Sequence, residues 1–213
     1  NFVGFYNLGF LAGISGEEVS CPFDKRRNGI VLGEGSAALL IEDEDYAKKR
    51  NARVYARILS VENSFDAYRS GKYQPSEEGL KKAISKAIES SGLEKEGIDC
   101  ILAAANSVPQ QDKLETLAIR ESFGTLADKI PVSAVKSMIG ENLSAAGIFQ
   151  AASAIGAMEK GFIPATINYK EKDPECDLDY VPNKSRSAEI KNVLINNFGP
   201  GGNNAAAIIS KYG

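Results

Sequence analysis

"SEEGLKKAISKAIESSGLEKEGIDCILAAA", residues 76–105, combines an amphipathic helix with a buried strand. Ser76 is followed by two glutamates, which is typical of a helix N-cap, and Gly92 is typical of a helix end. Between them, apolar residues recur at helical spacing and form one face: Leu80, Ala83, Ile84, Ala87 and Ile88. The apolar run at 98–105 has the length of a buried strand. A helix followed by such a strand predicts an α/β fold.

The same alternation extends on both sides of this unit. Strands are predicted before it at 35–43 and 53–64, with a short charged helix at 44–50 between them. The elements predicted after it are a helix (113–124), a short strand (130–135), a long helix (141–159) and two strands joined by a glycine-rich turn (192–210). This order predicts a layered α/β domain with a mixed, mostly parallel sheet. The long helix is apolar nearly all round, which predicts a buried central helix between layers.

Composition excludes several classes of protein. The 213 residues carry a formal net charge of -3, and the basic runs are short and flanked by acids, so no nucleic-acid surface is expected. No apolar run approaches the roughly 20 residues of a membrane span, and no signal peptide is visible. Because the chain begins with Asn rather than Met, we expect a fragment, a processed product or the ordered part of something longer.

Cysteine and histidine usage restricts the chemistry further. Cys21, Cys100 and Cys176 are widely separated, which fits idle thiols in a reducing cytoplasm. Their spacing matches no metal motif, and we expect neither a metal nor another cofactor. The chain has no histidine, so a mechanism that depends on imidazole cannot be completed by this chain alone.

Several blocks of the sequence resemble one enzyme family. They are "CPFDKRRNGIVLGEGSAALLIEDEDYAKKRNARVYARI" (21–58), "DKLETLAIRESFG" (112–124), "AVKSMIGENLSAAG" (134–147), "DPECDLDYVPNKSR" (173–186) and "NNFGPGGNNAAAI" (196–208). In this order and spacing they are similar to β-ketoacyl-acyl-carrier-protein synthases, the thiolase-fold condensing enzymes of fatty acid and polyketide synthesis. The resemblance implies a thiolase-like layered α/β/α fold, with residues 1–29 as the tail of the N-terminal half and residues 30–213 as the C-terminal ketosynthase domain.

The resemblance also indicates which catalytic residues are missing. The family's second half supplies two histidines, in motifs like HGTxTP and KSxxGH, and its nucleophilic cysteine lies upstream of this chain. The matching positions here are Ala104 in residues 104–109 and Glu141 in residues 136–141, so no catalytic residue is intact. An ionised carboxylate would repel the enolate oxygen that a histidine stabilises, and such a donor is worth about 3–4 kcal/mol. Cys21 lies in the "CPFD" turn and is not assigned the nucleophile's role.

Three residues that support the family's site are kept: Asp112, Glu115 and Lys136. The resemblance implies a buried pair between the lysine and Glu115. A second hypothesis is that Glu141 pairs with Lys136, five residues earlier across the Gly140 turn, and fills the space of the missing histidine.

The segment "FGPGGNN" matches the family's acyl-pocket turn, and its residues are Phe198, Gly199, Pro200, Gly201, Gly202 and Asn204. Pro200 stands where the family has a gating phenylalanine, so a swinging aromatic gate is lost. The glycines alone would also suit a tight turn between two strands, and Gly201 and Gly202 keep its backbone freedom.

Three functions remain open. The first is a catalytically silent subunit that pairs with an active ketosynthase and shapes its acyl tunnel, as chain length factors do. The second is an active acyltransferase with altered chemistry, which uses Lys136, Glu141 or Asn142 and a nucleophile from the missing half. The third is a non-catalytic module that binds acyl chains or carrier proteins. The resemblance implies an acyl carrier protein and a homodimer or heterodimer partner; neither nucleic acid nor a membrane is expected.

Overall fold

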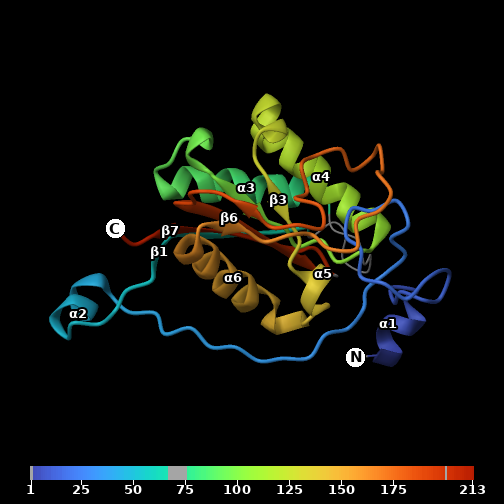
Figure 1. The fold of residues 1–213 in the computed structure, drawn as a ribbon, viewed down its shortest axis with the longest axis horizontal. Coiled ribbons are helices and arrows are strands. Elements are labelled where there is room, and N and C mark those ends of the chain that lie inside the picture. Colours follow the sequence, from blue (N-terminus) through green and yellow to red (C-terminus); the bar gives the residue numbers. More distant parts are fainter. Residues whose placement is uncertain (1, 67–75, 200) are drawn as a thin grey trace.

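The chain folds around one five-stranded sheet, shown by a computed structural model that describes residues 2–66, 76–199 and 201–213 (Figure 1). The strands are β1 (Ala56–Phe65), β2 (Cys100–Leu102), β3 (Val132–Ser133), β6 (Asn192–Gly199) and β7 (Asn203–Lys211). Their order is β1-β7-β6-β2-β3. Strand β7 is antiparallel to both neighbours, whereas β6, β2 and β3 are parallel, so β7 alone runs against the common direction of these strands. The predicted mixed, mostly parallel sheet is confirmed.

Helices cover both faces of this sheet, which gives the α/β/α layers (Figure 1). Helices α3 (Glu77–Ser91) and α4 (Pro109–Phe123) pack on one face, and α6 (Ala146–Lys160) packs on the other. Helix α3 begins and ends as predicted, because the Ser76 side chain accepts from the Gly79 N–H and Gly92 takes the left-handed conformation. Its apolar face lies in the largest hydrophobic core cluster of the described residues, and α6 packs with the sheet in a second cluster.

Helix α6 is buried on the face that contacts the sheet. Its buried side chains include Gln150, Ala154 and Met158, whereas Ala152 on the opposite side is exposed. The amide of Gln150 donates to the carbonyls of Leu102, Ala103 and Asn196, which ties the helix to β2 and β6. The predicted burial therefore holds for the face toward the sheet.

The strand predicted at 35–43 is wrong. Residues 35–42 make no backbone hydrogen bond to another strand in the described part of the chain, and Leu40 is 80% exposed. An apolar run alone does not make a strand, because its backbone groups also need a partner. The preceding residues do pair: Glu141 N donates to Val31 O, and Gly33 N donates to Glu141 O. Only glycine fits at position 33, since a Cβ there would lie 2.1 Å from the Ile139 carbonyl oxygen.

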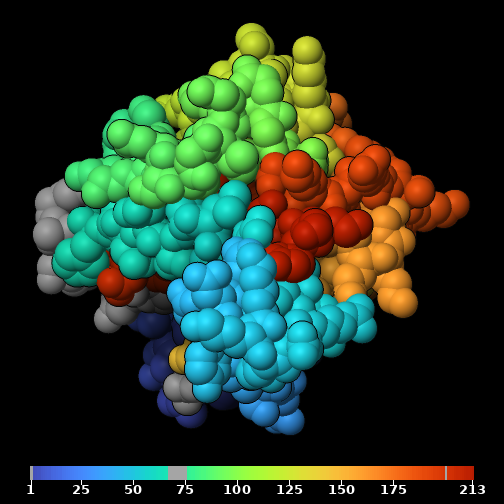
Figure 2. Space-filling model, turned by 90° about the vertical axis from the view of Figure 1, so that its left-hand side faces the viewer, coloured from blue at the N-terminus to red at the C-terminus, as the bar shows by residue number. Residues whose placement is uncertain are grey.

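The remaining α-helices and strands are short. They are α1 (Phe2–Asn7), α2 (Glu44–Lys49), α5 (Lys136–Ile139), β4 (Phe162–Ile163) and β5 (Arg186–Ser187), the last two forming an antiparallel pair. Figure 2 shows the segment around α2 and β1 on one face of the molecule, below the residues of α3. Among the described residues, no helix is long and apolar enough to cross a membrane.

Candidate functional site: a cavity at the carboxyl ends of the strands

A cavity of about 730 Å³ opens where the strands that share a direction end. Phe65 ends β1, Asn106 follows β2, Lys136 follows β3 and Phe198 lies at the end of β6, and all four residues line it. Ligands of α/β sheets bind at the carboxyl ends of the strands, because the loops there converge. The cavity is therefore the candidate functional site.

Glu141 is held at the wall of this cavity by three hydrogen bonds. Its Oε2 accepts from Lys136 Nζ at 2.8 Å and from Asn106 Nδ2 at 3.0 Å, and its Oε1 accepts from Leu143 N at 2.9 Å. Lys136 and Glu141 are both buried, at 3% and 7% exposure. The predicted pairing of Glu141 with Lys136 is confirmed. The pair that the resemblance implied between Lys136 and Glu115 is not formed, because Glu141 lies within reach of the ammonium and takes its place.

Replacing Glu141 with glutamine should lower the free energy of unfolding by about 1–3 kcal/mol, because the buried Lys136 ammonium loses its counter-charge. Urea denaturation measures this loss. Glu159→Gln is the matched control, since Glu159 pairs with a largely exposed Arg53 and such pairs contribute little. Equal stability of the Glu141→Gln variant and the unaltered chain would show that the pair is not stabilising.

Glu115 supports the wall from behind. The carboxylate is fully buried and accepts from Ala104 N at 2.9 Å, from Ala105 N at 2.8 Å and from Asn196 Nδ2 at 3.1 Å. Burial raises the pKa of Glu115 to about 7, against the hydrogen bonds from Ala104 and Asn196. Ala104, at the first of the two histidine positions, is buried and does not line the cavity. Glu115 thus fixes the backbone of the loop after β2.

Asp112 fixes the next part of the same loop. It accepts from Phe23 N at 2.9 Å and from Asn106 N at 3.1 Å, and Arg27 Nε lies 3.8 Å from it. Burial raises the pKa of Asp112 to about 6, against the charge of Arg27 and the backbone donors. Asp112 and Glu115, the two carboxyl groups retained from the family pattern, therefore hold the backbone of the loop after β2 in place. Neither of them lines the cavity.

The turn between β6 and β7 forms the opposite side of the cavity. Phe198, Gly199 and Asn204, three of the residues expected to form an acyl-pocket turn, line it. Gly201 and Gly202 have φ of 92° and 87°, which confirms their predicted backbone freedom. Pro200, and with it the predicted loss of a gate, lies outside the described residues.

This turn is tied to helix α3 by a contact that the sequence did not indicate. Asn204 Nδ2 donates to Asp66 Oδ2 at 3.2 Å, and Asp66 also accepts from the backbone and hydroxyl of Ser76. The N-cap of α3 is therefore linked to the cavity wall through one aspartate.

The three cysteines lie away from the cavity and are free and buried. Burial, together with the nearby Asp24, raises the pKa of Cys21 to about 11, and burial raises those of Cys100 and Cys176 to about 12. Thiols of this kind stay protonated at neutral pH and are poor nucleophiles. Their burial and raised pKa values fit the expectation of idle thiols.

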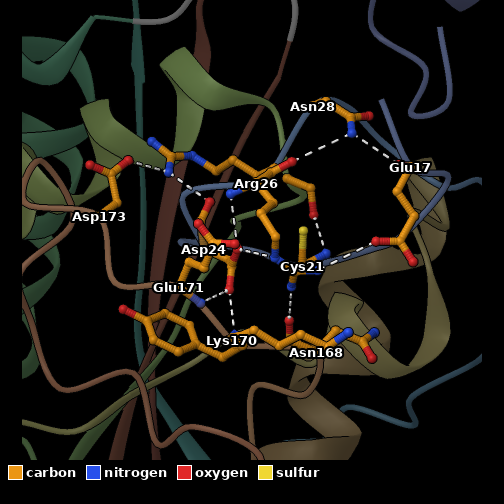
Figure 3. Close-up of polar contacts among 12 residues, drawn as sticks. Glu17, Cys21, Asp24, Arg26, Asn28, Asn168, Lys170, Glu171 and Asp173 are labelled. Atoms are coloured by element: carbon orange, nitrogen blue, oxygen red, sulfur yellow. Dashed lines mark hydrogen bonds and ion pairs between the residues drawn. The ribbon is translucent and has the colours of Figure 1, made fainter. Parts of the chain in front are cut away.

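Cys21 lies beside a clasp centred on Asp24 (Figure 3). Asp24 accepts from the backbone N–H groups of Arg26, Lys170 and Glu171 and from Arg26 Nε, while Arg26 also donates to Asn168 O at 2.8 Å. The segment 20–28 is thereby fastened to the loop 168–173, which joins residues that are far apart in sequence.

Sequence reasoning missed several residues that line the cavity. Gln111, in the first turn of α4, is 3% exposed, and Asn197 in β6 is half-buried. Phe5 and Phe10 reach the cavity from the N-terminal segment. The sequence offered a signal only for Gln111, because it is a polar residue next to Asp112 near the start of a helix. In the described residues, no group of three or more His, Cys, Asp or Glu side chains could hold a metal ion.

Fold and site together define a condensing-enzyme type of C-terminal domain, and comparison with known proteins agrees. The family model described as "Beta-ketoacyl synthase, C-terminal domain" matches residues 55–170, more than half of the chain. The chain belongs to the β-ketoacyl synthase family.

Individual relatives fall within fatty acid and polyketide synthases. The chain is 40% identical over 195 residues to 3-oxoacyl-[acyl-carrier-protein] synthase 2 of Coxiella burnetii, covering 92% of the chain and 47% of that protein. It is 38% identical over 192 residues to the tetracenomycin polyketide synthase ketoacyl synthase alpha subunit of Streptomyces glaucescens, covering 90% and 45%. The chain thus spans about half the length of these relatives.

Solved structures show the same likeness. The ishigamide ketosynthase/chain length factor superposes with a TM-score of 0.93 at 38% identity, over 100% of this chain and 51% of that one. A type II polyketide synthase acyl-carrier protein in complex with its ketosynthase bound to the hexaketide gives a TM-score of 0.94 at 30% identity, over 100% and 53%. The thiolase-like fold expected from the resemblance is confirmed.

Proposed function

We propose that the chain belongs to a catalytically silent β-ketoacyl synthase-like subunit of fatty acid or polyketide biosynthesis. In this proposal it pairs with an active ketosynthase and shapes the acyl chain that the partner extends, as chain length factors do. The observation that carries the proposal is the state of Glu141. Its carboxylate stands at a family histidine position and accepts three hydrogen bonds. A carboxylate has no positive charge and no N–H group to donate, so it cannot stabilise an enolate oxygen as a histidine does.

The other histidine position, Ala104, supports the same conclusion. Ala104 has no side-chain donor, and its backbone N–H is bound to Glu115. Losing two donors, each worth about 3–4 kcal/mol, would lower the rate of condensation by several orders of magnitude. The residues that support the site, Asp112, Glu115 and Lys136, are nevertheless retained. Their retention fits a subunit that shapes the acyl chain without catalysing condensation.

The relatives support a proposal about the partners. A ketosynthase/chain length factor and a ketosynthase in complex with an acyl-carrier protein are both structurally similar to this chain. We therefore propose a heterodimer with a ketosynthase that has both histidines, and an acyl carrier protein as the source of the acyl chain. Three free buried cysteines fit the reducing cytoplasm as its location.

The test is co-expression of the tagged chain with a ketosynthase that carries both family histidines. We expect the two to co-purify, and we expect the chain alone to show neither condensation nor decarboxylation of malonyl carrier protein. Condensation or decarboxylation by the chain alone would contradict the proposal and favour an acyltransferase with altered chemistry. Binding of acyl carrier protein without any ketosynthase partner would also contradict it and favour a non-catalytic binding module.

A further inference from the structure

Glu115 is a buried carboxyl group without a cation of its own. In the described part of the chain, no lysine or arginine forms an ion pair with it, because Lys136 pairs with Glu141 and Arg27 lies beside Asp112. A fully buried carboxyl group without a partner of opposite charge favours its protonated form. Glu115 is therefore expected to take up a proton more readily than an ordinary glutamate.

The hydrogen bonds around Glu115 suit only the ionised form. Among the described residues, every partner of its carboxyl group is a donor: Oε1 accepts from Ala104 N at 2.9 Å and from Asn196 Nδ2 at 3.1 Å, and Oε2 accepts from Ala105 N at 2.8 Å. A protonated carboxyl group carries an O–H that needs an acceptor. The arrangement as it stands offers none.

Asn196 carries the missing acceptor on the other atom of its amide. The residue is completely buried, and its Oδ1 has no hydrogen-bond partner in the part of the chain that the structure describes. Its backbone is fixed, because its carbonyl accepts from Gln150 Nε2 at 3.1 Å and β6 lies between β2 and β7. A half turn of the side-chain amide exchanges Nδ2 and Oδ1 without moving the strand.

We propose that Glu115 and Asn196 form a proton-operated switch behind the cavity wall. In the ionised state, the carboxylate accepts from Asn196 Nδ2. When Glu115 takes up one proton from solvent, an O–H bond forms at Oε1, the Asn196 amide turns over, and its Oδ1 accepts from this O–H. The inference does not depend on the proposed function, because it concerns the protein's own groups and no substrate.

Protonation weakens the hold on the loop after β2. In the ionised state Oε1 accepts from Ala104 N, and the oxygen of an O–H group is a weaker acceptor than a carboxylate oxygen. Oε2 stays unprotonated and keeps Ala105 N. The loop continues to Asn106, which donates to Glu141 in the cavity wall. Proton uptake is thereby linked to the wall of the site.

The switch operates near neutral pH. Burial raises the pKa of Glu115 to about 7, and the charge of Asp112 acts in the same direction, whereas the hydrogen bonds and Lys136 oppose it. Asp112 titrates in a similar range, because burial raises its pKa to about 6, so the two carboxyl groups have to be followed separately. Strands β2 and β6 contribute no charged side chain, and on α3 Lys81 turns to Glu121 at the surface. The titratable groups around Asp112 and Glu115 are Arg27 of the N-terminal segment, Lys136 and Glu141 at α5, and Asp173, Cys176 and Tyr180 of the loop 173–180.

Nuclear magnetic resonance of the unaltered chain tests the switch. The carboxyl ¹³C resonance of Glu115 reports its titration, and the nuclear Overhauser effect (NOE) between the Asn196 side-chain amide and the Ala104 N–H reports the orientation of the amide. Both groups donate to Oε1, and two protons about 2 Å from one oxygen lie within about 4 Å of each other.

We expect Glu115 to titrate at about 7, well above its ordinary 4.5. The NOE should be present at about pH 9 and lost at about pH 5, on either side of this titration. The Ala104 N–H resonance should shift with the same midpoint as the carboxyl group. A midpoint below about 5.5, or an NOE of equal strength at both pH values, would overturn the proposal.

Glu115→Gln is the matched variant, because a glutamine amide has the shape of the protonated carboxyl group and can donate to Asn196 Oδ1. In this variant we expect the NOE to be absent at both pH values. Glu121→Gln on the same helix is the control, since Glu121 is exposed and pairs with Lys81, and it should keep both the titration and the NOE. An NOE that persists in Glu115→Gln would contradict the rotation of the amide. If this variant does not fold, the titration and NOE of the unaltered chain decide the question.

Discussion

Replacing Glu115 with leucine is expected to lower the free energy of unfolding by about 3–5 kcal/mol, although the new side chain has a similar volume. The substitution leaves three buried donors without an acceptor, namely the N–H groups of Ala104 and Ala105 and the amide of Asn196. Chemical denaturation at pH 7.5 measures the effect. The loop after β2 should also lose protection against hydrogen exchange, because Glu115 is its anchor.

The matched control is Glu121→Leu on the same helix. Glu121 is exposed and pairs with Lys81 at 2.9 Å, an interaction worth less than about 1 kcal/mol. A loss in Glu115→Leu no larger than that of the control would contradict the anchoring role.

The pH dependence gives a second readout on the same variant. The folded-state pKa of Glu115, about 7, is above its ordinary value of 4.5, because burial disfavours the charged form. The folded chain therefore binds more protons than the unfolded chain between these values, and stability falls as the pH rises from about 5 to 7. The leucine variant should show a weaker decline. Some decline should remain, because burial raises the pKa of Asp112 as well.

Replacing Asp24 with alanine is expected to lower the free energy of unfolding by about 3–5 kcal/mol and to expose the segment 20–28 to proteolysis. Asp24 is completely buried, and its carboxylate accepts from three backbone N–H groups and from Arg26 Nε. These contacts join segments that are about 146 residues apart in the sequence. Trypsin cleavage near Lys25 and urea denaturation measure the two effects.

Asp177→Ala is the control for this substitution. Asp177 is exposed and accepts from Arg120 Nε at 2.8 Å, so its removal should change stability by less than about 1 kcal/mol. Burial raises the pKa of Asp24, but the hydrogen bonds from Glu171, Arg26 and Lys170 outweigh burial and hold the pKa below its ordinary value. The contribution of Asp24 is therefore present above the unfolded-state pKa and is lost as the pH falls through the folded-state pKa. If Asp24→Ala were as destabilising at pH 2 as at neutral pH, the ionised carboxylate of Asp24 would not be what joins these segments.

The site shows where sequence reasoning succeeded. Lys136 and Glu141 are five residues apart across a glycine turn, so their pairing depends on local geometry and could be predicted. The partners of Glu115 could not, because its acceptor role depends on the backbone of residues 104 and 105 and on Asn196 from another strand. Gln111 was missed for a similar reason, since only the folded chain shows which polar residue faces a cavity.

The sequence by itself determined the order of the five strands of the main sheet and of the helices α3, α4 and α6 that cover it. It also determined the caps of α3, the glycine turn before β7 and the absence of both family histidines, because these depend on residue types and short spacings. Only the tertiary structure decided that residues 35–43 form no strand, that Glu115 binds the backbone of residues 104 and 105, and that Lys136 and Glu141 are the charged residues of the described cavity wall. Backbone partners, burial and the neighbours of a charge are set by segments far apart in the chain. No local pattern contains that information.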